Sequence, residues 1–370
     1  MSEIKTRKYN KGEWSEILAC FKILSAKEWK INFGDGNGNK TEDYLLITDL
    51  FHINEKYHYC LNNNQYYLKH NDNLIAKYTF KETFEIIEKL KKEILTGNRA
   101  FSIQDTEIQN FFDKHKITKL KTGAENKSDI YFSFRDNKSN KKYNRAGFNI
   151  KSYFGSNPTL INPSAHTIFV YEIKLDSNKI NKIISKEKSI KKILNEIIKE
   201  KGEFNYLHNT SQSFNYNLRT IDTRFPEIFS KILLYKYVHS FSRLKDFPEC
   251  IDKLDIEIDN DENKELLKLQ IKKFLFASTT GMNPGTKWDG DRNCDGFIVL
   301  KKDMDLITYG IYNHEKEKML KDYLFYNSYI DTPSTKNAGT KYKEMVSKKI
   351  ILDKLDNKYK LYLNFQIRVK

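Results

Sequence analysis

Two ionisable side chains, those of Asp129 and Lys151, stand at positions where they can meet across a β-hairpin. Asp129 directly precedes the run 130–134, in which apolar residues alternate with more polar ones, and Lys151 lies near the end of a second alternating run, 146–153. The stretch between the runs is rich in charged residues and is typical of a turn. Because antiparallel neighbours bring the start of one strand beside the end of the next, this spacing predicts that the aspartate and the lysine lie close together.

An aspartate beside a lysine suits the hydrolysis of a phosphodiester. The phosphate is anionic and repels hydroxide, so the reaction needs a hard cation held by carboxylates and a positive group beside the attacking water. Mg²⁺ accepts one or two carboxylates and stabilises the charge that builds on the phosphate oxygens. We expect Asp129 to anchor the metal, the Ile150 carbonyl to add a neutral ligand, and Lys151 to orient or deprotonate the water. For a single such pair taken alone, a strand cap and an ordinary surface lysine are the better explanation.

The apolar pattern predicts the elements around this pair. Residues 11–26 place apolar side chains on one helical face, and the Lys-rich stretch 178–203 keeps the same spacing, so its lysines are expected on a solvated face. The Gly-rich stretch 34–40 lacks the Lys and Ser/Thr of a phosphate-binding loop and is expected to be a hairpin turn. Further helices are expected over 81–95, 104–115, 226–242, 262–276 and 315–326, and strands over 44–49, 56–61, 167–175, 296–312 and 348–369.

Composition limits the class of protein. The chain has 370 residues, of which 39% are hydrophobic and 14% aromatic, so it is a globular protein and not a disordered one. Its formal net charge of +15 fits a polyanionic partner or a solubilising Lys-rich surface. Residues 1–10 hold no apolar run of signal-peptide length, and the four cysteines form no C-x-x-C pair. We therefore expect a cytoplasmic protein with free thiols and no membrane span.

Several short blocks, in this order, make the sequence similar to a known family. They are KGEWSE, SDIYFSF, GFNIKS, TLINPSAHTIFVY, NLRTID, KWDG, DTPST and YLNFQIR, and they run from Lys11 to Arg368. Together they resemble the HpaII family of type II restriction endonucleases. The resemblance implies an α/β (α+β) fold of the PD-(D/E)xK class, with a mixed sheet flanked by helices. It also implies Mg²⁺ dependence, double-stranded DNA as the substrate, and recognition of CCGG.

The resemblance carries Asp129 and Lys151 onto the catalytic motif, with two departures. Ser128 stands where the motif has proline, and Asn149 stands where it has Asp or Glu. A neutral amide offers a metal only its carbonyl oxygen and no charge. A second carboxylate is therefore expected from elsewhere in the chain.

Two sources of that carboxylate remain open. Glu16, and less readily Glu13, lies on the first predicted helix, although acids in a first helical turn are also favoured by the helix dipole. Glu172 follows the lysine, and with Lys174 it forms an ExK pattern that could itself be a rival site. An outward-facing strand residue paired with a lysine is the ordinary explanation of Glu172.

Base readout and phosphate contacts need polar and cationic side chains outside the catalytic motif. The loop after the catalytic strand could reach a groove of the DNA, but it could also be simply a structured polar loop. The LRTIDTR segment could read a G·C pair, but it could also be a helix N-cap with flanking salt bridges. The DTPSTK loop suits phosphate contacts. The DNA-binding candidates are Thr159, Asn162, Ser164, Thr167, Arg219, Asp222, Arg224, Thr332, Ser334 and Lys336.

The organisation expected from these observations is a nuclease core over residues 1–175 and a part for DNA recognition and dimerisation over 176–370, with a soft boundary. A palindromic target favours a homodimer. A cognate cytosine DNA methyltransferase is the expected genetic partner. The alternatives are a DNA-binding protein that has lost cleavage with the change at Asn149, and a repair or RNA-processing nuclease without sequence specificity.

Overall fold

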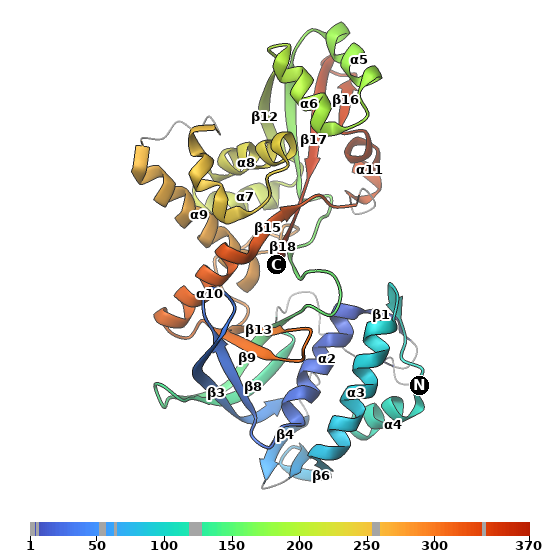
Figure 1. Cartoon of the computed structure of the whole chain (residues 1–370), viewed down its shortest axis with the longest axis vertical. Coiled ribbons are helices and arrows are strands. Elements are labelled where there is room, and N and C mark those ends of the chain that lie inside the picture. The colour runs from blue at the N-terminus through green and yellow to red at the C-terminus, as the bar shows by residue number, and fades with distance from the viewer. Residues whose placement is uncertain are drawn as a thin grey trace. The chain divides into compact units, whose positions relative to one another are not determined.

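The computed structural model describes residues 4, 7–51, 57–62, 65–117, 128–253, 260–334 and 338–370. The chain forms two compact units, each built from two separate segments (Figure 1). The first unit comprises Met1–Pro158 and Arg292–Tyr323, and the second comprises Thr159–Asp291 and Leu324–Lys370. The division differs from the predicted boundary after residue 175, because strand pairing draws a late segment into the first unit and the strand at 168–174 into the second.

The first unit is organised by a nine-stranded mixed sheet, which confirms the predicted fold class. Most neighbours are antiparallel, but β13 runs parallel to β9, and β14 runs parallel to β2. Since β2 also pairs with β3, the six strands from β2 to β3 close into a ring. The order is β2 (Lys30–Gly34), β14 (Leu306–Gly310), β13 (Gly296–Leu300), β9 (Lys142–Ser152), β8 (Ile130–Asp136), β3 (Lys40–Phe51), β4 (Tyr57–Asn62), β5 (Gln65–His70) and β6 (Asn73–Thr79).

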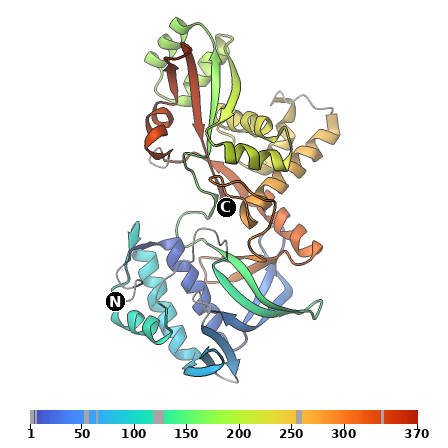
Figure 2. The same ribbon diagram turned by 180° about the vertical axis from the view of Figure 1, so that it is seen from behind.

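The predicted catalytic hairpin is present as β8 and β9. The two strands form a long hairpin, green in Figure 2. Ile130 pairs with Phe148, and Phe132 pairs with Ala146. The predicted Gly-rich turn joins β2 to β3, where the Asp35 N–H donates to the Asn39 carbonyl at 2.8 Å. Both turns were visible in the sequence because charged or Gly-rich residues interrupt alternating runs.

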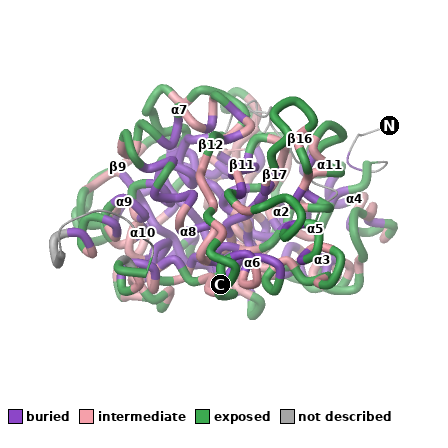
Figure 3. Tube along the Cα trace, turned by 90° about the horizontal axis from the view of Figure 1, so that it is seen from above, coloured by how far each residue is buried: buried purple, intermediate pink, exposed green. Residues whose placement is uncertain are grey.

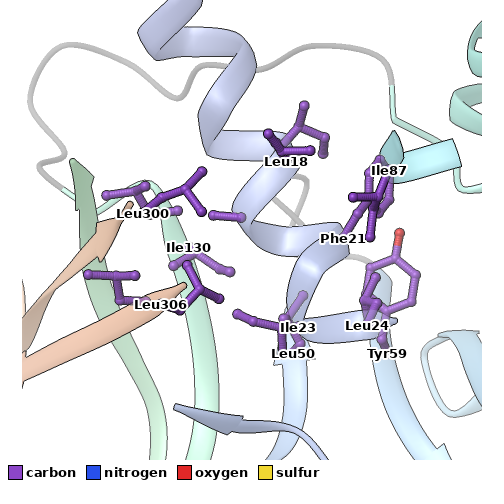
Figure 4. Packing of buried hydrophobic residues seen from close by; sticks show 14 of the residues in the cluster. Leu18, Phe21, Ile23, Leu24, Leu50, Tyr59, Ile87, Ile130, Leu300 and Leu306 are labelled. Carbon is purple, nitrogen blue, oxygen red and sulfur yellow. The ribbon is translucent and has the colours of Figure 1, made fainter. Parts of the chain in front are cut away.

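Helices cover the apolar face of this sheet. The first predicted helix is α2 (Lys11–Leu24), which packs against β9 and α3. Its Leu18 belongs to the same buried cluster as Ile130, Leu300 and Leu306 (Figure 4). The other elements of this unit are β1 (Tyr9–Asn10), α3 (Phe80–Thr96), β7 (Ala100–Phe101), α4 (Thr106–Lys114) and most of α10 (His314–Asn327).

The second unit contains two small sheets, ordered β12-β11-β17-β16 and β10-β18-β15. Strand β11 and helix α8 are largely buried (Figure 3). The strands are β10 (Thr159–Ile161), β11 (Ile168–Lys174), β12 (Glu203–Asn209), β15 (Ser328–Asp331), β16 (Ile350–Asp353), β17 (Lys358–Asn364) and β18 (Gln366–Val369). The helices are α5 (Ser177–Lys186), α6 (Ile190–Lys199), α7 (Gln212–Ile221), α8 (Phe225–His239), η1 (Leu244–Asp246), η2 (Pro248–Lys253), α9 (Asn260–Thr280) and α11 (Gly339–Lys348).

The Lys-rich stretch is helical as predicted, but it forms two helices, α5 and α6, with a break at residues 187–189. The hairpin strands β5 and β6, strand β12 and helices α7 and α11 were not predicted. Among the described residues, no helix combines the length and the apolar character needed to cross a bilayer.

Candidate active site

The structure brings Asp129 directly against the strand that carries Lys151. The main-chain N–H of Ile150 donates to Asp129 Oδ2 at 2.7 Å, and the Asp129 N–H donates to the Phe148 carbonyl at 2.8 Å. Asp129 therefore continues the β8–β9 ladder by one residue beyond the strand. The carboxylate thus lies against β9 at the residue just before Lys151.

The two faces of β9 have different surroundings. Phe148 and Ile150 are buried in the cluster that also contains the apolar face of α2. Since successive strand residues point to opposite faces, Asn149 and Lys151 point away from that cluster. Asn149 is 6% exposed and Lys151 is half-buried. A lysine so placed can act on a group bound at this face while its stem packs against the sheet.

An acidic residue that the sequence reasoning missed lies on the other side of β9. Asp295 precedes β13, and its Oδ2 accepts a hydrogen bond from the Gly147 N–H at 2.8 Å, while its own N–H donates to the Gly147 carbonyl at 2.6 Å. Both β8 and β13 begin opposite Phe148, so an aspartate stands at the head of each strand that flanks β9. The signal in the sequence was the same as at Asp129, an aspartate just before a buried strand.

The thiol of Cys294 is buried beside these charged groups. Burial is the main cause that raises the pKa of Cys294 to about 12. The charges of Asp295 and Asp129 also raise this pKa, whereas the charge of Lys151 lowers it. The direction of these effects shows that all three charged residues lie near one thiol, which is protonated at neutral pH.

The two glutamates of the first helix have different surroundings. Glu13 forms a capping box, in which its Oε2 accepts from the Asn10 N–H at 2.7 Å and its N–H donates to Asn10 Oδ1 at 3.1 Å. Glu16 lies one turn deeper and is half-buried. Helix α2 begins beside the end of β9, because a Cβ added at Gly155 would stand 3.4 Å from the Cβ of Lys11. The capping box therefore explains Glu13 as a helix-capping residue, whereas Glu16 lies outside this box.

Comparison with known proteins identifies the chain. The model of the HpaII restriction endonuclease family matches residues 10–369. The chain belongs to this family. It is also 31% identical, over 88% of its own length and 91% of the relative's, to the type II restriction enzyme HpaII of Haemophilus parainfluenzae. No solved structure matches the chain. The protein is therefore a type II restriction endonuclease, a site-specific nuclease of a restriction–modification system that acts on double-stranded DNA.

Type II restriction endonucleases generally need a divalent metal, and the donors at this site suit a hard cation. Asp129 supplies carboxylate oxygens beside the Ile150 backbone, and Asp295 adds a second carboxylate on the same stretch of β9. Within the described ranges, no group of three or more His, Cys, Asp or Glu side chains could hold a metal ion.

Glu172 and Lys174, the rival ExK pair, belong to the second unit, whereas Asp129 and Lys151 belong to the first. Glu172 lies on β11, where its Oε1 is 2.8 Å from the Nζ of Lys358. The structure thus gives this glutamate a lysine partner on the second unit's sheet. This is the ordinary role expected of an outward-facing strand residue, although the partner is not Lys174.

The predicted polar loop after the catalytic hairpin combines exposed and structural residues. Thr167 is fully buried, and its Oγ1 donates to Asn364 Oδ1 at 2.7 Å and accepts from the Ser164 N–H at 2.9 Å. These hydrogen bonds tie the loop to Asn364, the last residue of strand β17. Asn162 is exposed, and Thr159 and Ser164 are half-buried, so these three side chains can still meet a ligand.

The remaining DNA-binding candidates also divide by exposure. Arg219 and Arg224 are exposed, whereas Asp222 Oδ1 accepts from the Arg224 N–H at 2.8 Å and fixes the turn between α7 and α8. Thr332 and Ser334 are exposed, and the Thr332 hydroxyl is hydrogen-bonded to Lys236 Nζ. Lys336 lies outside the described residues.

Proposed function

We propose that this enzyme hydrolyses duplex DNA at or near CCGG in a reaction that depends on Mg²⁺. The observation that carries the proposal is the hydrogen bond between the Ile150 N–H and Asp129 Oδ2, which brings a carboxylate next to the strand of Lys151. The target sequence is proposed from the family and from the relative of the same name. The enzyme would act in the cytoplasm, where invading DNA is met.

The roles follow from the groups present. Asp129 would hold the metal, with Glu16 as the second acid, Ile150 contributing its carbonyl, and Asn149 contributing a neutral oxygen. When bound, Mg²⁺ would supply positive charge to the phosphate and to the attacking water. Lys151 orients that water for in-line attack and offsets the negative charge that develops.

Asp295 is an additional candidate for the second acid, since its carboxylate binds the backbone of the same strand. Glu172 remains a less favoured candidate, because its partner is Lys358. Because Asn149 carries no charge, one of these acids would supply the second carboxylate. Removing them one at a time shows which one does so.

DNA recognition would involve mainly the second unit. Thr159, Asn162, Ser164 and Thr167 lie in or after β10, and Arg219, Asp222 and Arg224 lie around the junction of α7 and α8. Together with Thr332, Ser334 and Lys336 they would contact bases and phosphates, with Thr167 and Asp222 acting by holding their loops. The division into a cleavage part (expected over 1–175) and a part for recognition and dimerisation (expected over 176–370) would then follow the two units, the first for cleavage and the second for recognition. A homodimer would match a palindromic site, and a cytosine methyltransferase would protect the host.

Cleavage of a mapped plasmid tests this function. A plasmid with several CCGG sites is incubated with the protein and Mg²⁺, with an EDTA control, and the Lys151→Ala variant is compared with Lys174→Ala. We expect discrete fragments that map to CCGG and that disappear with EDTA and with Lys151→Ala but not with Lys174→Ala. If Lys174→Ala abolishes cleavage and Lys151→Ala does not, the rival site is the catalytic one.

The acids are separated in the same assay. Glu16→Gln, Asp295→Asn and Glu172→Gln are measured over a range of Mg²⁺ concentrations, and the true ligand is the one whose loss raises the Mg²⁺ requirement. Fragments at other sites would overturn the CCGG assignment. A gel shift without any cleavage would mean that the change at Asn149 has removed activity and left a DNA-binding protein.

A further inference from the structure

The second unit contains a cleft that the catalytic mechanism does not use. Its volume is about 650 Å³, and it is lined by residues of β12, by α7 and by the start of α8. A volume of this size falls within the range of clefts that hold small organic ligands. Its lining includes two arginines, a lysine and several aromatic and amide side chains.

The charged side chains that line the cleft are mainly cationic. Arg219, Arg224 and Lys231 line it, against Glu227 as the single carboxylate. Both arginines are exposed, and the structure gives neither guanidinium an ion pair or a hydrogen bond among the described residues. A guanidinium offers a planar fork of donors that matches a phosphate. The entrance is therefore suited to a phosphate group.

The inner wall carries a hydroxyl that needs an acceptor. Tyr206 lines the cleft, and its hydroxyl is buried without a hydrogen-bond partner in the described part of the chain. Burial, and then the charge of Glu227, raise the pKa of Tyr206 to about 12, so the hydroxyl keeps its proton at neutral pH. An unsatisfied buried donor is unfavourable. Because this hydroxyl has almost no accessible surface in the empty cleft, the Tyr206 side chain has to turn toward the cleft before an acceptor on a ligand can relieve it.

We propose that this cleft binds one nucleotide unit, with its phosphate on Arg219 and Arg224 and its base accepting a hydrogen bond from Tyr206. The proposal rests on the proposed function to the extent that DNA would supply the nucleotide. A free nucleoside 5′-monophosphate has the same chemistry, and so has an unstacked nucleotide of a DNA strand. In the second case the arginines grip the backbone of an extruded nucleotide and do not read a base pair in the groove.

Binding to the full-length protein in EDTA tests the cleft without cleavage. Deoxycytidine and deoxyguanosine 5′-monophosphates, the corresponding nucleosides and inorganic phosphate are titrated by calorimetry. We expect the monophosphates to bind more tightly than phosphate or nucleoside alone. Arg219→Ala combined with Arg224→Ala should weaken monophosphate binding more than about tenfold. Tyr206→Phe should weaken it about two- to tenfold and leave the binding of inorganic phosphate unchanged.

A matched control removes the same charge elsewhere in the unit. Lys182→Ala combined with Lys186→Ala alters two exposed lysines of α5 and should leave nucleotide binding unchanged. Thermal unfolding of each variant checks that it is folded. If phosphate and monophosphate bind equally well, or if the control weakens binding as much as the arginine pair, the site is only a diffuse positive surface and the proposal is overturned.

A second arm identifies the source of the nucleotide. Duplexes with 2-aminopurine at successive positions in and around CCGG are bound in EDTA, where a rise in fluorescence marks an unstacked base. A rise that depends on Arg219, Arg224 and Tyr206 assigns the nucleotide to DNA; monophosphate binding without such a rise assigns it to the free pool. If none of the ligands binds but the plasmid is cut, the proposal of nucleotide binding in the cleft is wrong and the proposed cleavage function stands. Monophosphate binding with an intact plasmid overturns the cleavage proposal alone.

Discussion

Substitution of the buried lysine of α8 should stabilise the protein at neutral pH and lose this effect at high pH. Lys236 is 8% exposed, and its Nζ is hydrogen-bonded to the Thr332 hydroxyl. Burial is the main cause that lowers the pKa of Lys236 from 10.5 to about 8; Asp331 raises this pKa, and Lys349 lowers it further. We expect Lys236→Met to remove a charge that the fold accommodates poorly.

The magnitude follows from the lowered pKa of Lys236. The difference of 10.5 − 8 = 2.5 pH units, at about 1.4 kcal/mol per unit, gives about 3 kcal/mol for keeping the ammonium charged in the fold at pH 7. The lost hydrogen bond to Thr332 offsets about 1 kcal/mol of this. Lys236→Met should therefore raise the free energy of unfolding by about 2 kcal/mol at pH 7.

The stability difference between Lys236→Met and the wild-type protein should depend on pH. A lysine with a lowered pKa binds its proton more tightly in the unfolded chain, so the wild-type protein gains stability as the pH rises from about 8 to 10.5. The advantage of Lys236→Met should therefore shrink to almost nothing near pH 10. Urea unfolding at pH 7 and pH 10 measures the difference, with Lys182→Met on exposed α5 as the control. An equal difference at both pH values would refute the argument from charge burial.

Three further predictions concern the catalytic hairpin and the loop that follows it. Gly147→Ala should lower the free energy of unfolding by about 1–3 kcal/mol and reduce cleavage, because the added Cβ would stand 2.3 Å from the Ser128 hydroxyl oxygen, beside Asp129. The control is Gly155→Ala, whose nearest contact would be at 3.4 Å. This control should be nearly neutral in urea unfolding and in plasmid cleavage. Asn149→Asp should lower the Mg²⁺ concentration needed for half-maximal cleavage, since it adds a carboxylate two residues before the lysine; an unchanged requirement would place this side chain outside the metal site. Thr167→Val should lower the free energy of unfolding by about 1–3 kcal/mol, measured in urea, because it leaves buried hydrogen-bond partners unsatisfied.

The β8–β9 hairpin could be predicted from the sequence because its information is local. The alternating runs fix the two strands, the charged turn joins them, and the register then brings Asp129 to Ile150. The helical face of residues 11–26 was equally clear, and α2 occupies Lys11–Leu24. Periodicity and turn chemistry are strong signals when neighbours in space are also neighbours in the chain.

Long-range pairing is what the sequence could not supply. Asp295 reaches the site because β13 runs parallel to β9, and nothing in the segment itself states which strand it will join. The same limit explains the boundary between the units, since β11 pairs with β12 and β17. Strand β12 was missed because it follows closely on the helical Lys-rich stretch, and only a weak turn signal separates the two. Pairing partners of distant strands are decided by packing, which single-sequence patterns do not record.

The parallel neighbour of β9 also has a consequence for biosynthesis. The strand that carries Lys151 is complete early in the chain, but β13 and β14 come from residues 296–310. Until the ribosome has released those residues, β9 is an open edge strand, the ring of six strands is not closed, and Asp295 is absent from the site. A prematurely terminated chain that ends before residue 296 thus lacks the closed sheet on which the proposed catalytic residues lie. The late strand ties nuclease assembly to near-complete translation, so incomplete products would not cut the DNA of the cell that makes them.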